Sequence, residues 1–259
     1  MSIMKPFFTA IAFGTSILTE NITNVVSLNI QNANTGQTIP ATMHGLILET
    51  NINRGDDGGL YAELVYNRAF QEMGRSLDGW ITYGEGSIGL SNIQPLSNAL
   101  PVQMKFTLTE TSASPSGFQN GGFYGMNTQA QSYTATFYYR PSANAHVGGG
   151  KLTIGLGDAA GLDVFGTSTV DVSNAPANVW SNFSASISVY LAAPSTQNVF
   201  FIEFPPNSKG NFEFNLISCF PPTFKNRTNG VRIDIAQRFI WNNTIGPLKN
   251  RPGRQGSWV

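Results

Sequence analysis

The chain has 259 residues, with 15 Lys and Arg against 15 Asp and Glu, so its formal net charge is zero. Charged residues make up only 12% of the sequence, which is about half the usual share. This balance excludes the basic surface typical of nucleic-acid-binding proteins, and a hydrophobic content of 41% excludes a disordered chain. Asn, Ser, Thr and Gln supply the polarity instead, and together with 12% aromatic residues they are typical of β-rich extracellular proteins.

The sequence is poor in residues that bind metals. Its single cysteine, Cys219, excludes an internal disulfide bond and a thiolate metal cluster, and two histidines, His44 and His146, are too few for an imidazole site. We therefore expect no metal and no cofactor. Cys219 lies in an alternating stretch, which favours a buried structural thiol over a nucleophile. The Gly-rich turn at residues 55–59 lacks a Walker lysine and predicts no phosphate site.

Residues 1–20 have the features of a signal peptide. Lys5 precedes a mostly apolar run over residues 7–18, which is too short to span a bilayer. The alternative is an N-terminal strand or a disordered end. We expect export, secretion and no membrane association. Four N-x-S/T triplets fit an exported glycoprotein, and they begin at Asn21, Asn182, Asn226 and Asn242.

The first expected elements lie between residues 21 and 75. Residues 25–30 are predicted to be a strand, and residues 45–50 form a short apolar run that fits a buried strand. A tight turn follows, and the spacing of apolar residues over 60–70 predicts a helix.

From residue 76 to residue 220 apolar and polar residues alternate. Half-buried strands separated by Gly, Pro, Asn and Ser predict a mainly β fold, an antiparallel jelly-roll β-sandwich. The expected strands cover residues 102–108, 133–139, 183–189, 199–204 and 212–220. The alternation predicts that five of their side chains point into the core: Met104, Phe106, Phe137, Ile187 and Phe214.

A third region begins at residue 221. Pro221 and Pro222 mark a linker-like step, and residues 230–238 could form a helix. The remaining residues up to 259 are mostly polar.

Carboxylates and exposed aromatic rings are the candidates for chemistry. Glu49 ends an apolar run, the position at which barrel enzymes place site residues, although a solvated strand end gives the same pattern. Aromatic rings can stack on the apolar faces of sugars, and Trp80, Tyr124 and Trp180 are the candidates. For any one of them, packing in the core is the alternative.

Two segments carry a specific resemblance. Residues 44–70, HGLILETNINRGDDGGLYAELVYNRAF, resemble the N-terminal signature of fungal and plant α-L-arabinofuranosidases of glycoside hydrolase family 51. Residues 218–256, which include WNNTIGPLKNRPGRQG, resemble a later stretch of the same family. The resemblance implies a (β/α)8 catalytic barrel with β-sandwiches and the retaining removal of terminal α-L-arabinofuranosyl groups. That mechanism needs two carboxyl groups about 5 Å apart.

The resemblance also implies that the barrel is incomplete here. A barrel needs about 250 residues, whereas few follow Phe220, so both catalytic glutamates are expected beyond Val259 and this chain is expected to hold no catalytic residue. Residues 21–75 would supply the first barrel strand and helix, and residues 221–259 a partial barrel segment. Glu49 matches a family residue that contacts arabinose, and Glu49 and Asn51 are the implied substrate-binding residues.

Three hypotheses follow. The first is an arabinofuranosidase truncated before most of its barrel, with plant cell-wall polysaccharide or arabino-oligosaccharide as its partner. The second is a carbohydrate-binding β-sandwich without catalysis. The third is a non-functional product of a gene model. Because both flanks match one barrel in the family, we expect residues 44–70 and 221–240 to lie close together.

Overall fold

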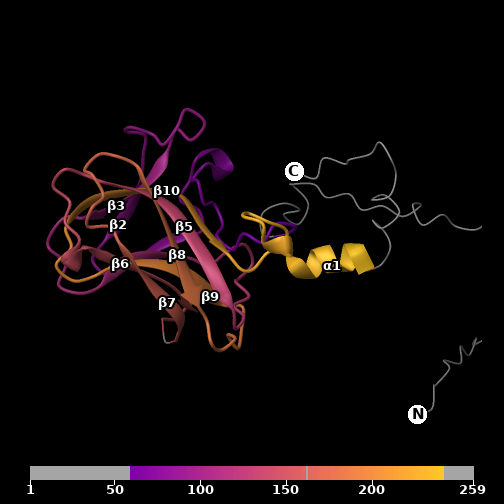
Figure 1. Cartoon of the computed structure of the whole chain (residues 1–259). Helices are drawn as coiled ribbons and strands as arrows, with labels where there is room; N and C mark the ends of the chain where they lie inside the picture. The colour runs from indigo at the N-terminus through magenta and orange to yellow at the C-terminus, as the bar shows by residue number, and fades with distance from the viewer. Residues whose placement is uncertain (1–58, 162, 242–259) are drawn as a thin grey trace, which may run out of the picture. The chain divides into compact units, whose positions relative to one another are not determined.

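The computed structural model describes residues 59–161 and 163–241. Two five-stranded antiparallel sheets pack face to face in this part of the chain (Figure 1). The first sheet has the order β1 (Trp80–Tyr83), β4 (Ser116–Asn120), β9 (Asn198–Phe204), β6 (Lys151–Asp158) and β7 (Val164–Asp171). The second has the order β2 (Ser87–Ser91), β3 (Gln103–Leu108), β10 (Gly210–Phe220), β5 (Ser132–Pro141) and β8 (Ser181–Ser188).

Few described residues are helical. One helix, α1 (Ile233–Trp241), follows the end of β10, and three short 3-10 turns cover Glu72–Gly74, Gly148–Gly150 and Phe224–Asn226. None of the helices in the described residues is long and apolar enough to cross a membrane. The mainly β fold with two packed sheets is therefore confirmed. The helix predicted over residues 230–238 is also present, although it begins three residues later.

The core lies between the two sheets, where alternate side chains of each strand meet. Phe212 and Phe214 of β10 pair with Phe106 and Met104 of β3, and all four side chains are fully buried. The rings of Phe204 and Phe212 lie 4.5 Å apart, so the two sheets interlock through aromatic contacts. All five side chains predicted to point inward are fully buried.

Cys219 is buried in β10 as a free thiol, as the alternation predicts. Burial raises the pKa of this thiol well above its usual value, and the charge of Glu63 adds to the effect. Cys219 therefore stays protonated and acts as a small apolar side chain.

The helix predicted over residues 60–70 is wrong, because this segment is extended and then turns. Its backbone N–H groups donate to distant carbonyls instead of to those one helical turn earlier. The N–H of Ala62 bonds Gly230 O, and that of Leu64 bonds Cys219 O, each at 3.0 Å. Tertiary pairing with the C-terminal flank and with β10 thus overrides the local helical spacing.

The two flanking segments lie side by side, as predicted. Tyr61 and Val231 form an antiparallel bridge, and the N–H of Arg232 donates to Leu60 O at 3.0 Å. Residues 44–58 lie outside the described residues, so the prediction is tested only for the end of that segment. Whether these flanks belong to a barrel stays a prediction.

Candidate functional site

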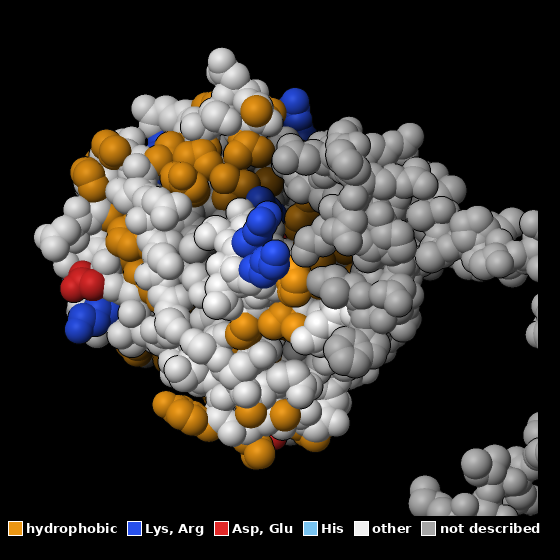
Figure 2. All heavy atoms as spheres, turned by 45° about the vertical axis from the view of Figure 1, so that its right-hand side comes forward, with side chains coloured by type: hydrophobic (Ala, Val, Ile, Leu, Met, Phe, Trp, Pro, Cys, Tyr) orange, Lys and Arg blue, Asp and Glu red, His pale blue; other side chains and the backbone are white. Residues whose placement is uncertain are grey.

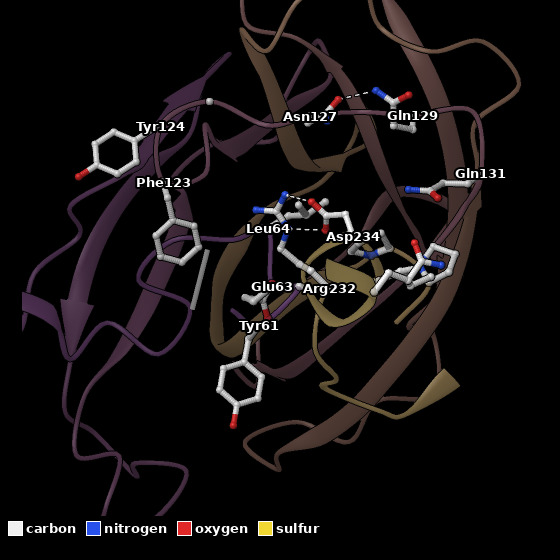
Figure 3. A pocket seen from close by; sticks show the side chains of 16 residues that line it. Tyr61, Glu63, Leu64, Phe123, Tyr124, Asn127, Gln129, Gln131, Arg232 and Asp234 are labelled. Carbon is white, nitrogen blue, oxygen red and sulfur yellow. Dashed lines mark hydrogen bonds and ion pairs between the residues drawn. The ribbon is translucent and has the colours of Figure 1, made fainter. Parts of the chain in front are cut away.

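A pocket of about 550 Å³ opens where three segments meet (Figure 3). They are the extended segment at residues 61–64, the loop between β4 and β5 at residues 123–131, and the start of α1. Prolines 221 and 222 complete the lining. The pocket exists because backbone pairing holds the flanks against the end of β10, next to this loop.

Aromatic rings and amides form the wall contributed by the loop. The side chain of Tyr124 is 81% exposed, and the ring of Phe123 packs against Tyr66 at 5.5 Å between centroids. Three amide side chains line the same wall (Figure 3): Asn127, Gln129 and Gln131. Rings beside uncharged hydrogen-bonding groups suit a neutral, hydroxyl-rich ligand, because apolar carbon faces can stack while amides bind hydroxyls.

Across the pocket, Arg232 and Asp234 form a bidentate ion pair. Arg232 Nε donates to Asp234 Oδ1 at 3.1 Å and Nη2 donates to Oδ2 at 2.8 Å. Burial opposes ionisation of Asp234, but the hydrogen bond and charge of Arg232 outweigh it and lower the pKa of Asp234. Asp234 is therefore an ionised acceptor near neutral pH and is not available as a general acid.

Glu63 also lines the pocket, but it is only 1% exposed. Its Oε1 accepts the backbone N–H groups of Val65 at 3.0 Å and Cys219 at 2.9 Å. Its Oε2 accepts hydrogen bonds from the hydroxyl of Ser218 and from Nη1 of Arg68, the second at 3.2 Å. Burial raises the pKa of Glu63, and these donors oppose the rise. Hydrogen-bond donors therefore occupy both oxygens of this carboxylate.

The described pocket therefore lacks a free acid–nucleophile pair. Asp234 is held by arginine, and Glu63 is saturated by donors from β10 and its own segment. No group of three or more His, Cys, Asp or Glu among residues 59–161 and 163–241 could hold a metal ion.

The structure treats the three predicted sugar-stacking rings differently. Tyr124 lines the pocket. Trp80 is a correction, because its side chain is 4% exposed and packs against Phe70 and Phe118 inside the sandwich, which leaves no free ring face for a sugar. Trp180 lies away from the pocket, and the guanidinium of Arg140 covers one face of its ring at 5.2 Å.

The remaining predicted positions divide by location. Glu49 and Asn51, the implied substrate-binding residues, lie outside the described residues, as do Asn21 and Asn242. Asn182 on β8 and Asn226 in a turn are both exposed.

Sequence reasoning missed the three amides and the Arg232–Asp234 pair. The pocket is formed by segments more than a hundred residues apart in the sequence. A local sequence pattern cannot predict that such segments meet. A retrospective signal is the alternation of amides at positions 127, 129 and 131, which places them along one side of an extended loop.

A buried polar cluster beneath residues 91–94 was also missed. Arg140 bonds Glu213 and Gln94, and its Nη2 donates to Ile93 O at 2.5 Å. Glu213 also accepts the hydroxyl of Ser91 at 2.7 Å. The cluster attaches a loop to the outer side of the second sheet. Charges are sparse at the surface as well: on the face drawn in Figure 2, hydrophobic side chains lie between uncharged polar ones and only a few Lys, Arg, Asp or Glu are visible.

Fold and site together define a two-sheet β-sandwich with a pocket of aromatic rings and amides at its flanks. Comparison with known proteins shows which family this chain resembles. The solved structure of an arabinose-bound family 51 α-L-arabinofuranosidase matches with a TM-score of 0.67 and 33% identity, over 80% of this chain and 34% of that one. The probable α-L-arabinofuranosidase A of Aspergillus flavus is 26% identical over 92% of this chain and 41% of its own length. α-L-Arabinofuranosidase 1 of Arabidopsis thaliana is 25% identical over 89% of this chain and 38% of its own length. No protein-family model matches the chain.

These likenesses confirm the resemblance read from the sequence: the chain is related to the α-L-arabinofuranosidases of glycoside hydrolase family 51. It spans about 40% of the length of the curated relatives that it matches.

Proposed function

We propose that this chain is part of an α-L-arabinofuranosidase that removes terminal non-reducing α-L-arabinofuranosyl residues from arabinoxylan or arabinan. The described region serves this reaction by binding carbohydrate, and the pocket beside Tyr124 holds an arabinosyl group. The observation that carries the proposal is the match to an arabinose-bound relative that is 33% identical over 80% of this chain.

The chemistry of the pocket supports binding over cleavage. Retaining hydrolysis needs one carboxylic acid to protonate the leaving oxygen and one carboxylate to attack the sugar carbon. Neither Glu63 nor Asp234 is free for these roles, because each is bound by hydrogen-bond donors. The described part of the chain therefore fits a carbohydrate-binding role better than a catalytic one.

Two measurements on the purified chain test this proposal. Release of p-nitrophenol from the α-L-arabinofuranoside should not exceed that of the Glu49→Gln variant, and turnover well above this control would overturn the binding-only assignment. An arabino-oligosaccharide should bind in calorimetry, and Tyr124→Ala should weaken it severalfold while Tyr190→Ala, a change at another exposed tyrosine, leaves it unchanged. Absence of binding by the unsubstituted chain would overturn the proposal.

Export is part of the same proposal. Asn182 and Asn226 are exposed and accessible to glycosylation, which fits a secreted protein. When the chain is expressed in a eukaryotic secretory host, treatment with peptide-N-glycosidase should lower its apparent mass. Substitution of both asparagines by Gln should remove part of that shift.

A further inference from the structure

The outer face of the first sheet has an unusual composition that the pocket does not use. Phe200, Ile202 and Phe204 of β9 point into the core, so Phe201 and Glu203 point to the opposite face. Strand register places two rows of residues across this face. One row is Tyr83, Gly117, Glu203, Thr153 and Thr169, and the other is Ile81, Gln119, Phe201, Gly155 and Thr167.

Glycines lie under the aromatic side chains of this face. A Cβ at Gly155 would stand 2.4 Å from Cζ of Phe201, and one at Gly157 would stand 3.7 Å from its Cε1. The ring of Phe201 therefore lies across the backbone of β6. Glycine weakens a strand, and in mid-strand it marks a close approach that a larger residue would block. Here the approaching group is an aromatic ring.

Tyr83 is arranged in the same way. A Cβ at Gly117 would stand 2.8 Å from its hydroxyl, so the side chain reaches across β4. The hydroxyl donates to Glu203 Oε2 at 3.3 Å. Burial and the charge of Glu203 raise the pKa of Tyr83, so its hydroxyl keeps its proton and remains a donor. Two aromatic side chains thus rest along the sheet, on strands β1 and β9, whose backbones lie two strand spacings or roughly 10 Å apart.

The polar groups between the rings favour a neutral ligand. Gln119 and Thr153 are half-buried and offer an amide and a hydroxyl, and Glu203 offers a carboxylate. Among the described residues no Lys or Arg forms an ion pair with Glu203. A polyanion would meet this unneutralised carboxylate and be repelled, whereas sugar hydroxyls would donate to it. Ile81, 58% exposed, extends the apolar surface at the sheet edge.

We propose that this face binds the main chain of a neutral polysaccharide, with sugar rings stacked on Phe201 and Tyr83 and hydroxyls bonded to Glu203 and Gln119. We call it the aromatic platform, and it consists of Ile81, Tyr83, Gln119, Thr153, Phe201, Glu203 and the glycines beneath them. The platform deepens the proposed function, on which it rests, because it would hold the polymer while the pocket takes an arabinosyl side group. The spacing of the two rings requires a ligand of at least two sugar units, so a monosaccharide is not its ligand.

Affinity electrophoresis of the purified chain in gels containing unsubstituted xylan tests the platform separately from the pocket. Xylan should retard the unsubstituted chain, and Phe201→Ala should raise the dissociation constant about tenfold. Tyr83→Ala should have a similar effect, whereas Tyr190→Ala, the loss of a tyrosine that is 89% exposed in a loop, should have none. Near-ultraviolet circular dichroism checks that each variant keeps its fold.

Any of four results would overturn the platform. The first three are an absence of retardation by xylan, xylan binding that survives both Phe201→Ala and Tyr83→Ala, and equal retardation by polygalacturonate. The fourth is a dimer that dissociates on Phe201→Ala, which would make this face an interface between two copies. A different set of results would contradict the proposed function of the pocket. In that case arabino-oligosaccharide would not bind, or its binding would not respond to Tyr124→Ala, while retardation by xylan would be unchanged.

Discussion

Replacing Glu63 by Ala tests whether this carboxylate joins the N-terminal flank to the sandwich. It is the acceptor for the N–H groups of Val65 and Cys219 and for the hydroxyl of Ser218. Each buried donor that loses its partner costs about 1–3 kcal/mol. Arg68 is 31% exposed and can turn to water, so its ion pair adds little. The loss of all three buried donors' partners should therefore cost about 3–9 kcal/mol, a large part of the stability of a typical domain.

Urea denaturation followed by tryptophan fluorescence measures this loss. Trp80 is well placed as a reporter, because it is buried between Phe70 and Phe118. The matched control is Glu110→Ala, which removes a carboxylate that is 89% exposed and paired with Lys209 at 3.7 Å. This control should change the free energy of unfolding by less than about 0.5 kcal/mol. If Glu63→Ala lowers the free energy of unfolding by less than about 1 kcal/mol, the argument that its loss leaves buried donors unsatisfied is wrong.

Three further predictions follow from buried groups. Burial raises the pKa of Glu63 above its usual 4.5, so ionising it costs folding stability. The stability of the unsubstituted chain relative to Glu63→Gln should be highest below that value and fall as pH rises through the raised folded-state pKa. Urea midpoints from pH 4 to 8 would show this, and a constant difference would contradict it. Arg140→Ala leaves Glu213 buried without its cation and should cost about 3–5 kcal/mol, whereas Lys151→Ala on the exposed surface should cost under about 0.5 kcal/mol, both by the same denaturation assay. Phe214→Ala should cost about 3–5 kcal/mol and lower the thermal midpoint in calorimetry, and a shift of only one or two degrees would show that the core is less tightly packed than its ring contacts indicate.

Local patterns predicted the strands that alternate most regularly. Residues 103–108 and 132–141 form strands close to the expected bounds, because each has one face toward apolar neighbours and one toward water. The same pattern predicted the burial of Phe137 and Ile187. Long motifs also indicated the family without any structure, since GGLYAEL and WNNTIGPLKNRPGRQG are too long and ordered to match by chance.

Trp80 and Glu63 show where local patterns fail. The sequence allowed two roles for Trp80, stacking on a sugar or packing in the core. The antiparallel pairing of β1 with β4 turns its ring inward, so Trp80 packs in the core. Glu63 lies in a stretch with helical spacing, yet its segment is extended because the N–H of Leu64 pairs with Cys219 across the fold. A strong contact with a distant strand outweighs the weak local preference for a helix.

The sequence by itself determined the fold class, the core-facing residues of the regular strands and the family resemblance, because these depend on short-range periodicity and on long ordered motifs. Only the tertiary structure decided where the pocket and the platform lie. The pocket joins Tyr124 to Arg232 across more than a hundred residues, and the platform depends on strand register that sets Phe201 over Gly155. Register and long-range pairing arise from the packing of the whole sandwich, so no window of the sequence contains them.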